Sequence, residues 1–403
     1  MIGRRSLPGS PHDMRQAPPL YTATLGRYLP LPLGSLRVNT PVPVDIWSAR
    51  GTLLLARFQT LESQAQIDQL AELQPMVRDI HYFELLLGSG DPQDVIAGAD
   101  LNPLIGWPAL QERLSALLRG EVEPGELPNR LAVLAAAAGK MLAAHRDKSL
   151  FMLTQMVYDQ DLGYCASHAL MSAAVCQLLA RDAGLCDWER DSLGKAALTM
   201  NIAMSALQDQ LAQQAGPPDE AQRSHIAGHA QQSAVRLREL GVTDPFWLDL
   251  VEHHHDPVAD HEDPAANSQL IAASLLWMVD QWVARISPRR SRSGLMPSLA
   301  ARNIYVAMQT RDAALGNLLV KTLGIYPPGS YVKLRTGEIA VVVGSGDRAH
   351  QPLTLAVVSA NGIQFQHPVA RDTQREDCAV TASLVIAPDV SIRLNPTKLF
   401  RQP

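Results

Sequence analysis

The sequence LVEHHHD, residues 250–256, contains three consecutive histidines near the expected end of a helix. Neutral imidazole is the commonest nitrogen ligand for divalent metals in proteins. Other histidines lie upstream on expected helices at His168, His225 and His229, and the last two stand four residues apart, on one helix face. The pattern indicates a metal site on a helical scaffold. A solvent-exposed helix end is the alternative, because histidine near a C-terminus interacts favourably with the helix dipole.

The downstream segment QLIAASLLWMVDQWV, residues 269–283, places Asp280 within an otherwise apolar helix. Burial of an unpaired carboxylate costs free energy, so this acid requires a metal, a cation or a water-filled pocket. Asp280 therefore favours the metal site over the exposed helix end.

The chain is expected to be mainly α, with an all-helical domain between two smaller β-containing regions. Val42, Val44 and Ile46 alternate in a strand-like pattern, and Ser63–Leu73 follows as a helix. Beyond residue 129, prolines divide helical sequence into segments of ordinary length. The predicted parts are a disordered tail at 1–20, a small β-rich module of mixed type at 21–87, a linker with a helix at 88–128, the helical domain at 129–325 and a C-terminal β region at 326–403.

Two hairpins are expected in the C-terminal β region. The sequence SYVKLRTGEIAVVVGSGD predicts a turn at Thr336-Gly337-Glu338, and LTLAVVSANGIQF predicts a second at Asn361-Gly362. The region is therefore a compact β-hairpin appendage.

The composition of the 403 residues limits the classes of function. A net charge of -5 argues against a general nucleic-acid binder, which needs a dominant positive surface. The four cysteines show no CxxC spacing, and the basic N-terminus leads into no apolar run of a signal peptide. No stretch approaches the ~18 continuous apolar residues of a spanning helix. These features predict a reduced, cytoplasmic protein with no membrane segment.

The order of the candidate ligands resembles the HD-GYP family, a branch of the HD phosphohydrolases that hydrolyses the bacterial messenger cyclic di-GMP. Its pattern is a helix with a histidine, a His-Asp-Ile-Gly-Lys segment, a His-Pro motif, a His-His-Glu motif with a Gly-Tyr-Pro loop, and a helix with an aspartate. The matching positions are His168, Met200-Asn201-Ile202-Ala203-Met204, His229, His254-His255 and Asp280. His253-His254 is the alternative register for the histidine pair. The flanks also resemble the family, so the resemblance extends from about Tyr21 over nearly the whole chain.

Several residues depart from the family at the positions that the resemblance assigns to catalysis. Hydrolysis in this family resembles a two-metal mechanism, in which adjacent ions share the attacking hydroxide. The bridging aspartate is replaced by Asn201, its histidine neighbour by Met200 and the lysine by Met204. Tyr164 stands where some members carry a glutamate, and residues 256–261 contain no Gly-Tyr-Pro loop. The resemblance thus implies a degenerate catalytic centre.

The retained ligands imply a smaller metal centre. His168 and Asp280 remain at the first ion's position, while His229, His254 and His255 form most of the second ion's shell. Three imidazoles with an open position can hold one zinc-like ion. We expect one divalent ion (iron, manganese or zinc) or none. The alternative is that these histidines are relics, hydrogen-bonded or exposed.

The basic segment SPRRSRSG, residues 287–294, is a candidate phosphate-binding element. Its arginines are Arg289, Arg290 and Arg292. Guanidinium groups suit bidentate phosphate contacts, and family members place arginines similarly. A solvated loop between helices is the alternative.

Two classes of function compete. The first is a catalytically impaired protein of bacterial cyclic di-GMP signalling that binds cyclic di-GMP, a related nucleotide or a signalling protein partner. The second is a metal-dependent phosphohydrolase, such as a cyclic di-GMP phosphodiesterase, that uses a reduced metal site. Loss of the His-Asp pair and the lysine favours the first, and the retained histidines with Asp280 favour the second. A pure protein–protein adaptor is a third class. The sequence contains no indication of the input signal or the oligomeric state.

Overall fold

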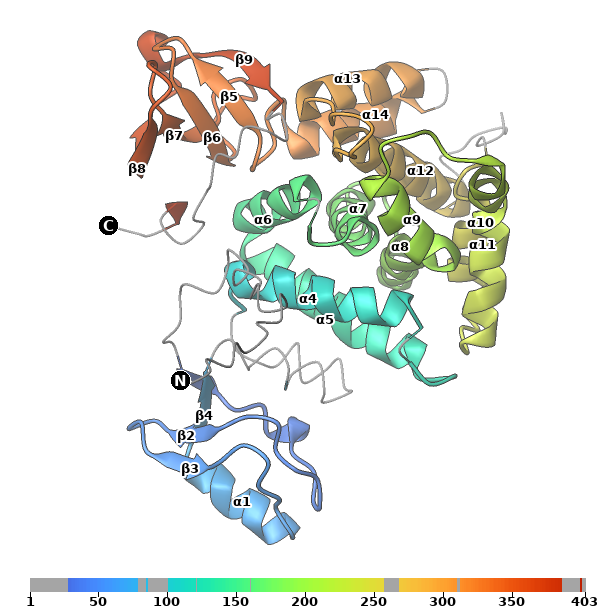
Figure 1. Cartoon of the computed structure of the whole chain (residues 1–403), viewed down its shortest axis with the longest axis vertical. Helices are drawn as coiled ribbons and strands as arrows, with labels where there is room; N and C mark the ends of the chain where they lie inside the picture. Colours follow the sequence, from blue (N-terminus) through green and yellow to red (C-terminus); the bar gives the residue numbers. More distant parts are fainter. Residues whose placement is uncertain are drawn as a thin grey trace, which may run out of the picture.

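The structure is a computed structural model of the whole chain, and it describes residues 28–78, 85, 101–120, 122–159, 161–256, 268–309, 312–385 and 399–400. The predicted tail at 1–20 and the stretch from 257 to 261, where the Gly-Tyr-Pro loop was expected to be missing, lie outside the described residues. Figure 1 shows a helical centre with one small sheet at the bottom of the view and another at the top left.

The N-terminal region is a four-stranded antiparallel sheet with one helix. Its order is β1-β4-β2-β3, and the strands are β1 (Tyr28–Pro30), β2 (Ile46–Ser48), β3 (Leu53–Leu55) and β4 (Pro75–Arg78). Helix α1 (Gln64–Glu72) begins where the Ser63 side chain accepts a hydrogen bond from the Gln66 N–H. Its Ile67 and Leu70 are buried, as the apolar spacing predicts.

The central region is helical throughout its described part, which confirms the mainly α fold class. Its helices are α4 (Pro103–Leu118), α5 (Leu127–Ala144), α6 (Arg146–Tyr158), α7 (Tyr164–Ala180), α8 (Asp187–Thr199), α9 (Ser205–Gln213), α10 (Glu220–Glu239), α11 (Pro245–His253), α12 (Ser268–Ile286), α13 (Pro297–Met308) and α14 (Ala313–Leu323). Helix α7 is apolar on all sides and packs against α4, α5, α6, α8, α9, α12 and α14. A helix with no polar face is a core helix, and α7 is the centre of the assembly in Figure 1.

Local capping fixes where the helices of the site begin. The Asp244 carboxylate accepts hydrogen bonds from the Phe246 and Trp247 N–H groups, and Pro245 occupies the first turn of α11. The Trp247 indole donates to the Thr199 hydroxyl at the end of α8 across 2.8 Å. These contacts set the direction of α11 and therefore the place where its histidine-rich end emerges.

The C-terminal region is a five-stranded antiparallel sheet of order β8-β7-β6-β5-β9. Its strands are β5 (Tyr331–Leu334), β6 (Ile339–Gly344), β7 (Leu353–Val358), β8 (Gln364–Arg371) and β9 (Val380–Leu384). Both expected hairpins form, with the turns falling between β5 and β6 and between β7 and β8. The last strand, β9, returns to pair with β5.

The C-terminal sheet contacts helix α6. The Gln155 amide donates to the Gly329 carbonyl at 2.9 Å, and the Tyr331 hydroxyl donates to the Gln155 side-chain oxygen at 3.2 Å. Gly329 has a φ of +92°, and a Cβ there would lie 2.6 Å from the Cβ of Thr154. Only glycine fits this close approach. Across the described parts of the chain, no helix combines the length and the apolar character needed to cross a membrane.

Candidate metal centre

Three histidines from two helices converge in the central region. His229 lies within α10, and His254 and His255 directly follow the last residue of α11. Their candidate ligand atoms all lie within 4.8 Å of one another, and the Nε2 atoms of His229 and His254 are 3.2 Å apart. His229 and His254 are buried, whereas His255 is exposed. The cluster therefore has a buried side and a side open to solvent.

Main-chain hydrogen bonds determine which ring nitrogens can bind a cation. Nδ1 of His229 lies 2.6 Å from the Ile226 carbonyl, and Nδ1 of His254 lies 2.7 Å from the Val251 carbonyl. A carbonyl only accepts, so each Nδ1 carries a proton and each neutral ring presents a lone pair at Nε2. Two lone pairs facing each other at this distance repel, and a shared cation removes the repulsion. Nitrogens bound at ~2.0–2.1 Å to a tetrahedral ion stand about 3.4 Å apart, so the observed spacing fits one ion.

Burial keeps the two inner rings in their metal-binding form. Loss of solvation lowers the pKa of His229. For His254, loss of solvation, followed by the nearby charge of His255, lowers the pKa to about 3. Because metals bind the neutral imidazole, protons do not compete for these two nitrogens near neutral pH.

The third consecutive histidine, His253, lies outside the cluster. Its side chain is half exposed, and its Nδ1 donates to the Asp256 carboxylate at 2.7 Å. This hydrogen bond raises the pKa of His253. The geometry therefore selects the His254-His255 register and assigns His253 to the solvent-exposed face of the helix end. Upstream, the Nε2 of His225 contacts the Ala203 carbonyl at 3.1 Å, and His225 is not one of the three clustered histidines.

His168 of α7 and Asp280 of α12 contact each other directly. Their Nε2 and Oδ1 atoms are 2.9 Å apart, and both side chains are buried. Burial raises the pKa of Asp280, but the hydrogen bond and the charge of His168 outweigh it, so the net pKa is lowered. The carboxylate is therefore ionised and hydrogen-bonded to His168. This partner offsets the free-energy cost of burying the charge.

The residues in place of the His-Asp pair offer no comparable ligands. Met200 closes α8, and Asn201 precedes the short 3-10 helix Ile202–Met204. Met200, Asn201 and Met204 are all buried, at 0 %, 6 % and 7 % exposure. A thioether and a neutral amide cannot offset the charge of two adjacent divalent ions. The residues present fit one ion at the three histidines and do not fit a second ion beside His168.

Tyr164 and Arg289 cover the His168 side of the site. The Tyr164 ring stacks on the His168 ring with centroids 5.7 Å apart, and the Arg289 guanidinium lies 4.8 Å from the Tyr164 centroid. Arg289 also donates a hydrogen bond of 2.9 Å to the Tyr164 hydroxyl. The individual residues stood out in the sequence, but their contact did not, because they are separated by 125 positions.

The other two candidate arginines lie in the same turn after α12. Arg290 is exposed, and its main-chain N–H donates to the Ala212 carbonyl at 2.8 Å. The Arg292 side chain donates to the Ala284 carbonyl, and partial burial, followed by the charge of Arg289, lowers its pKa. Among the three, only the Arg290 side chain has no protein partner within the described residues.

Comparison with known proteins adds an independent observation. No family model matches the chain. A cyclic di-GMP phosphodiesterase of Pseudomonas aeruginosa is 27% identical over 184 residues, which are 44% of this chain and 44% of that protein. The match therefore spans less than half of the relative's length. A solved structure, an HDG"Y"P protein from Bdellovibrio bacteriovorus, is 13% identical with a TM-score of 0.43, and covers 73% of this chain and 99% of that chain.

The fold and the site define a mainly helical protein with flanking antiparallel sheets and a three-histidine cluster in its helical centre. The sequence relative supports the resemblance to the HD-GYP type that the motifs carry.

Proposed function

We propose that this chain is a catalytically impaired HD-GYP-like protein of bacterial cyclic di-GMP signalling. It holds one divalent ion at His229, His254 and His255 and acts by binding a nucleotide or a protein partner. The ion would act as a Lewis acid that attracts phosphate oxygens.

The direct contact between His168 and Asp280 is the observation that carries this proposal. The ionised Asp280 carboxylate only accepts, so the Nε2 of His168 at 2.9 Å carries a proton and presents no lone pair to an ion. Met200 and Asn201 stand where the family has a histidine and an aspartate. The ligands that would bind an ion beside His168 and Asp280 are therefore missing. Without a second ion, the hydroxide of a two-metal mechanism loses one of the two charges that activate it.

The nucleotide is inferred from the relative and from the basic turn. The curated relative is a cyclic di-GMP phosphodiesterase, which supports a guanine dinucleotide as the ligand class. Arg290 is exposed and its side chain has no protein partner within the described residues, whereas Arg289 is held by Tyr164 and Arg292 by the Ala284 carbonyl. We therefore expect Arg290 to contribute most to phosphate binding, with Arg289 shaping the turn.

The test combines metal content, binding and turnover on the purified chain. After loading with manganese or with iron under anaerobic conditions, we expect about one ion per chain, binding of cyclic di-GMP and no formation of the linear dinucleotide. His254→Ala should abolish metal retention, whereas the matched control His253→Ala should preserve it, since His253 is half exposed and outside the cluster. Two ions per chain would refute the reduced centre.

A second candidate is an active phosphohydrolase that works with the single ion. The exposed edge at His255 favours it, because three protein ligands with an open position are typical of catalytic zinc sites. This candidate predicts hydrolysis of cyclic di-GMP that disappears in His254→Ala and persists in His253→Ala. If neither binding nor hydrolysis of the dinucleotide is detected, while the ion is retained, a protein partner becomes the remaining ligand class.

A further inference from the structure

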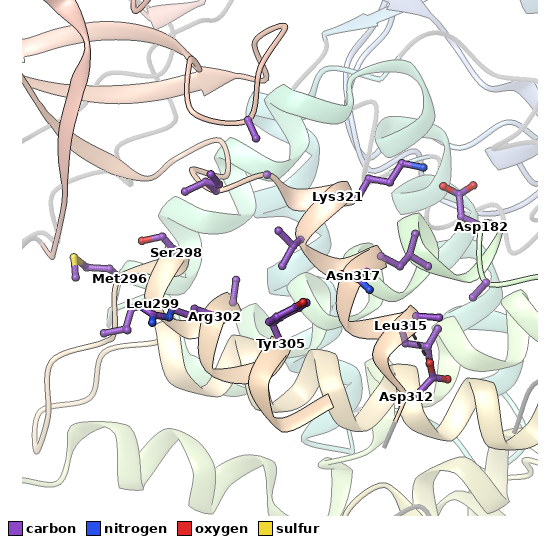
Figure 2. A pocket seen from close by; sticks show the side chains of 18 of the residues that line it. Asp182, Met296, Ser298, Leu299, Arg302, Tyr305, Asp312, Leu315, Asn317 and Lys321 are labelled. Carbon is purple, nitrogen blue, oxygen red and sulfur yellow. Dashed lines mark hydrogen bonds between the residues drawn. The ribbon is translucent and has the colours of Figure 1, made fainter. Parts of the chain in front are cut away.

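A cavity of about 1340 Å³ lies between helices α13 and α14, and none of the clustered histidines lines it. Ile271 of α12 and Ala349, in the loop between β6 and β7, contribute to its lining. Figure 2 shows the side chains that α13 and α14 direct toward it. Pockets that bind drug-sized ligands occupy roughly 300–1,000 Å³, so this space accommodates an extended molecule.

The wall formed by α13 combines three polar side chains with the apolar Leu299 and Ala301. Ser298, Arg302 and Tyr305 all line the cavity, and their spacing of four and three residues puts them on one stripe of the helix. Within the described parts of the chain, Arg302 has no acidic partner and the Tyr305 hydroxyl has no hydrogen bond. The Arg302 guanidinium and the Tyr305 hydroxyl are therefore available to a ligand.

The wall formed by α14 and the residues that follow it is mainly apolar. Ala314, Leu318 and Ile325 line the cavity at spacings of four and seven residues, with Lys321 between the last two. Polar side chains on α13 facing mainly apolar side chains on α14 are an arrangement that suits an amphipathic ligand.

Among the residues labelled in Figure 2, both acidic ones lie on the same side of the view. Asp182 and Asp312 appear at the right, with Lys321 on the same side as Asp182, whereas Arg302 appears at the left beside Leu299. The Asp312 carboxylate accepts the Leu315 N–H at 3.0 Å and so is occupied as the cap of α14. A negative group entering at the left meets a cation without a neighbouring carboxylate among the residues labelled there.

Close contact at one end holds the two helices together. A Cβ added to Gly316 of α14 would lie 2.8 Å from the Cβ of Met308 at the end of α13. Glycine is therefore required where the start of α14 approaches the end of α13. This approach sets the spacing of the two helices at one end of the cavity.

We propose that the cavity between α13 and α14 binds an amphipathic anion: an acyl or alkyl chain lies along α14, and a carboxylate or phosphate head group pairs with Arg302 and Tyr305. The site is separate from the histidine cluster and does not depend on the proposed function. Burial of the apolar chain supplies most of the affinity, and the cation selects the sign of the head group.

The test is isothermal titration calorimetry of the full chain with decanoate, decyl phosphate and decyltrimethylammonium, each below its critical micelle concentration. We expect both anions, or one of them, to bind at a single site and the cationic amphiphile to bind at least about tenfold more weakly. Binding of only one anion identifies the head group as carboxylate or as phosphate. Equal binding of the cation, or no binding of either anion, overturns the proposal.

Two variants locate the site. Arg302→Gln should weaken anion binding about three- to tenfold, because the guanidinium is exposed and partly screened by water. Ala314→Trp, at an exposed position in the lining, should fill the groove and abolish binding. Lys333→Gln, which removes an exposed cation of β5 outside the cavity, is the matched control and should bind as the parent does. Unchanged binding by both cavity variants, with native circular dichroism, would place the ligand elsewhere and refute the site.

Discussion

Acidification from pH 7 to pH 5 should weaken the folded state through His254. Its side chain is 1 % exposed, and burial, followed by the charge of His255, lowers its pKa to about 3. In the unfolded chain a histidine has a pKa of about 6.5, so below that pH the unfolded state binds more protons. The stability that neutral His254 contributes is therefore present above pH 6.5 and is lost as the pH falls toward 3.

The size of this effect follows from the difference between the two pKa values. At pH 5 an unfolded histidine is about 97% protonated, whereas the folded ring is almost wholly neutral. Linkage then gives a loss of about 2 kcal/mol in the free energy of unfolding between pH 7 and pH 5. A folded pKa of about 4 would give nearly the same loss in the free energy of unfolding, because a pKa of either 3 or 4 lies below the interval from pH 5 to pH 7.

His253 acts in the opposite direction. Its hydrogen bond with Asp256 raises its pKa, so its contribution is present below pH 6.5 and is lost as the pH rises. The side chain is half exposed, and surface pairs of this kind are worth ~0–1 kcal/mol. The expected net change is therefore still a loss of stability on acidification.

The assay is urea unfolding of the metal-free chain at pH 7 and pH 5, followed by far-ultraviolet circular dichroism. Between these two pH values the parent should lose about 2 kcal/mol more than His254→Gln, which has no titrating ring at this position. His253→Gln is the control and should lose at least as much as the parent, because it lacks the group that stabilises at low pH. An equal change in the parent and in His254→Gln would refute the reasoning.

Three further perturbations test other parts of the structure. Met200→His combined with Asn201→Asp should raise the metal content from one ion toward two per chain, and should lower the melting temperature when metal is absent, because a buried charge then lacks a partner. Tyr164→Phe removes the hydroxyl that accepts from an arginine, and should cost about 1 kcal/mol in chemical denaturation without a change in metal content. Gly329→Ala brings a Cβ to 2.6 Å from Thr154 at a φ of +92°, and should cost about 2–4 kcal/mol, measured as a lower melting temperature.

Local patterns predicted the secondary structure well where the physical cause is local. The turn residues at Thr336-Gly337-Glu338 and Asn361-Gly362 define both hairpins, because glycine at positive φ is required there. The pairing of β9 with β5 joins residues that are about fifty positions apart, and no local signal marks it. Pairing across such separations depends on tertiary packing.

In the candidate site, too, some features follow from local sequence and others depend on tertiary packing. The motif order singled out His168 and Asp280, which the structure brings into contact across 112 positions. The choice between the two histidine registers could not be made from three identical adjacent residues. It depends on where α11 ends, which leaves His253 in solvent and turns His254 inward.

The anchoring of the C-terminal sheet on α6 has a consequence for how this chain can be altered. Because Gln155 bonds to both Gly329 and Tyr331, a cut near residue 325 would leave the half-buried amide of Gln155 on α6 without these partners. We propose that the helical region and the C-terminal sheet, which meet at residues 325–326, are not stable separately from each other. A tag or reporter is better inserted at the tip of the β7–β8 hairpin, where residues 360–363 are all exposed.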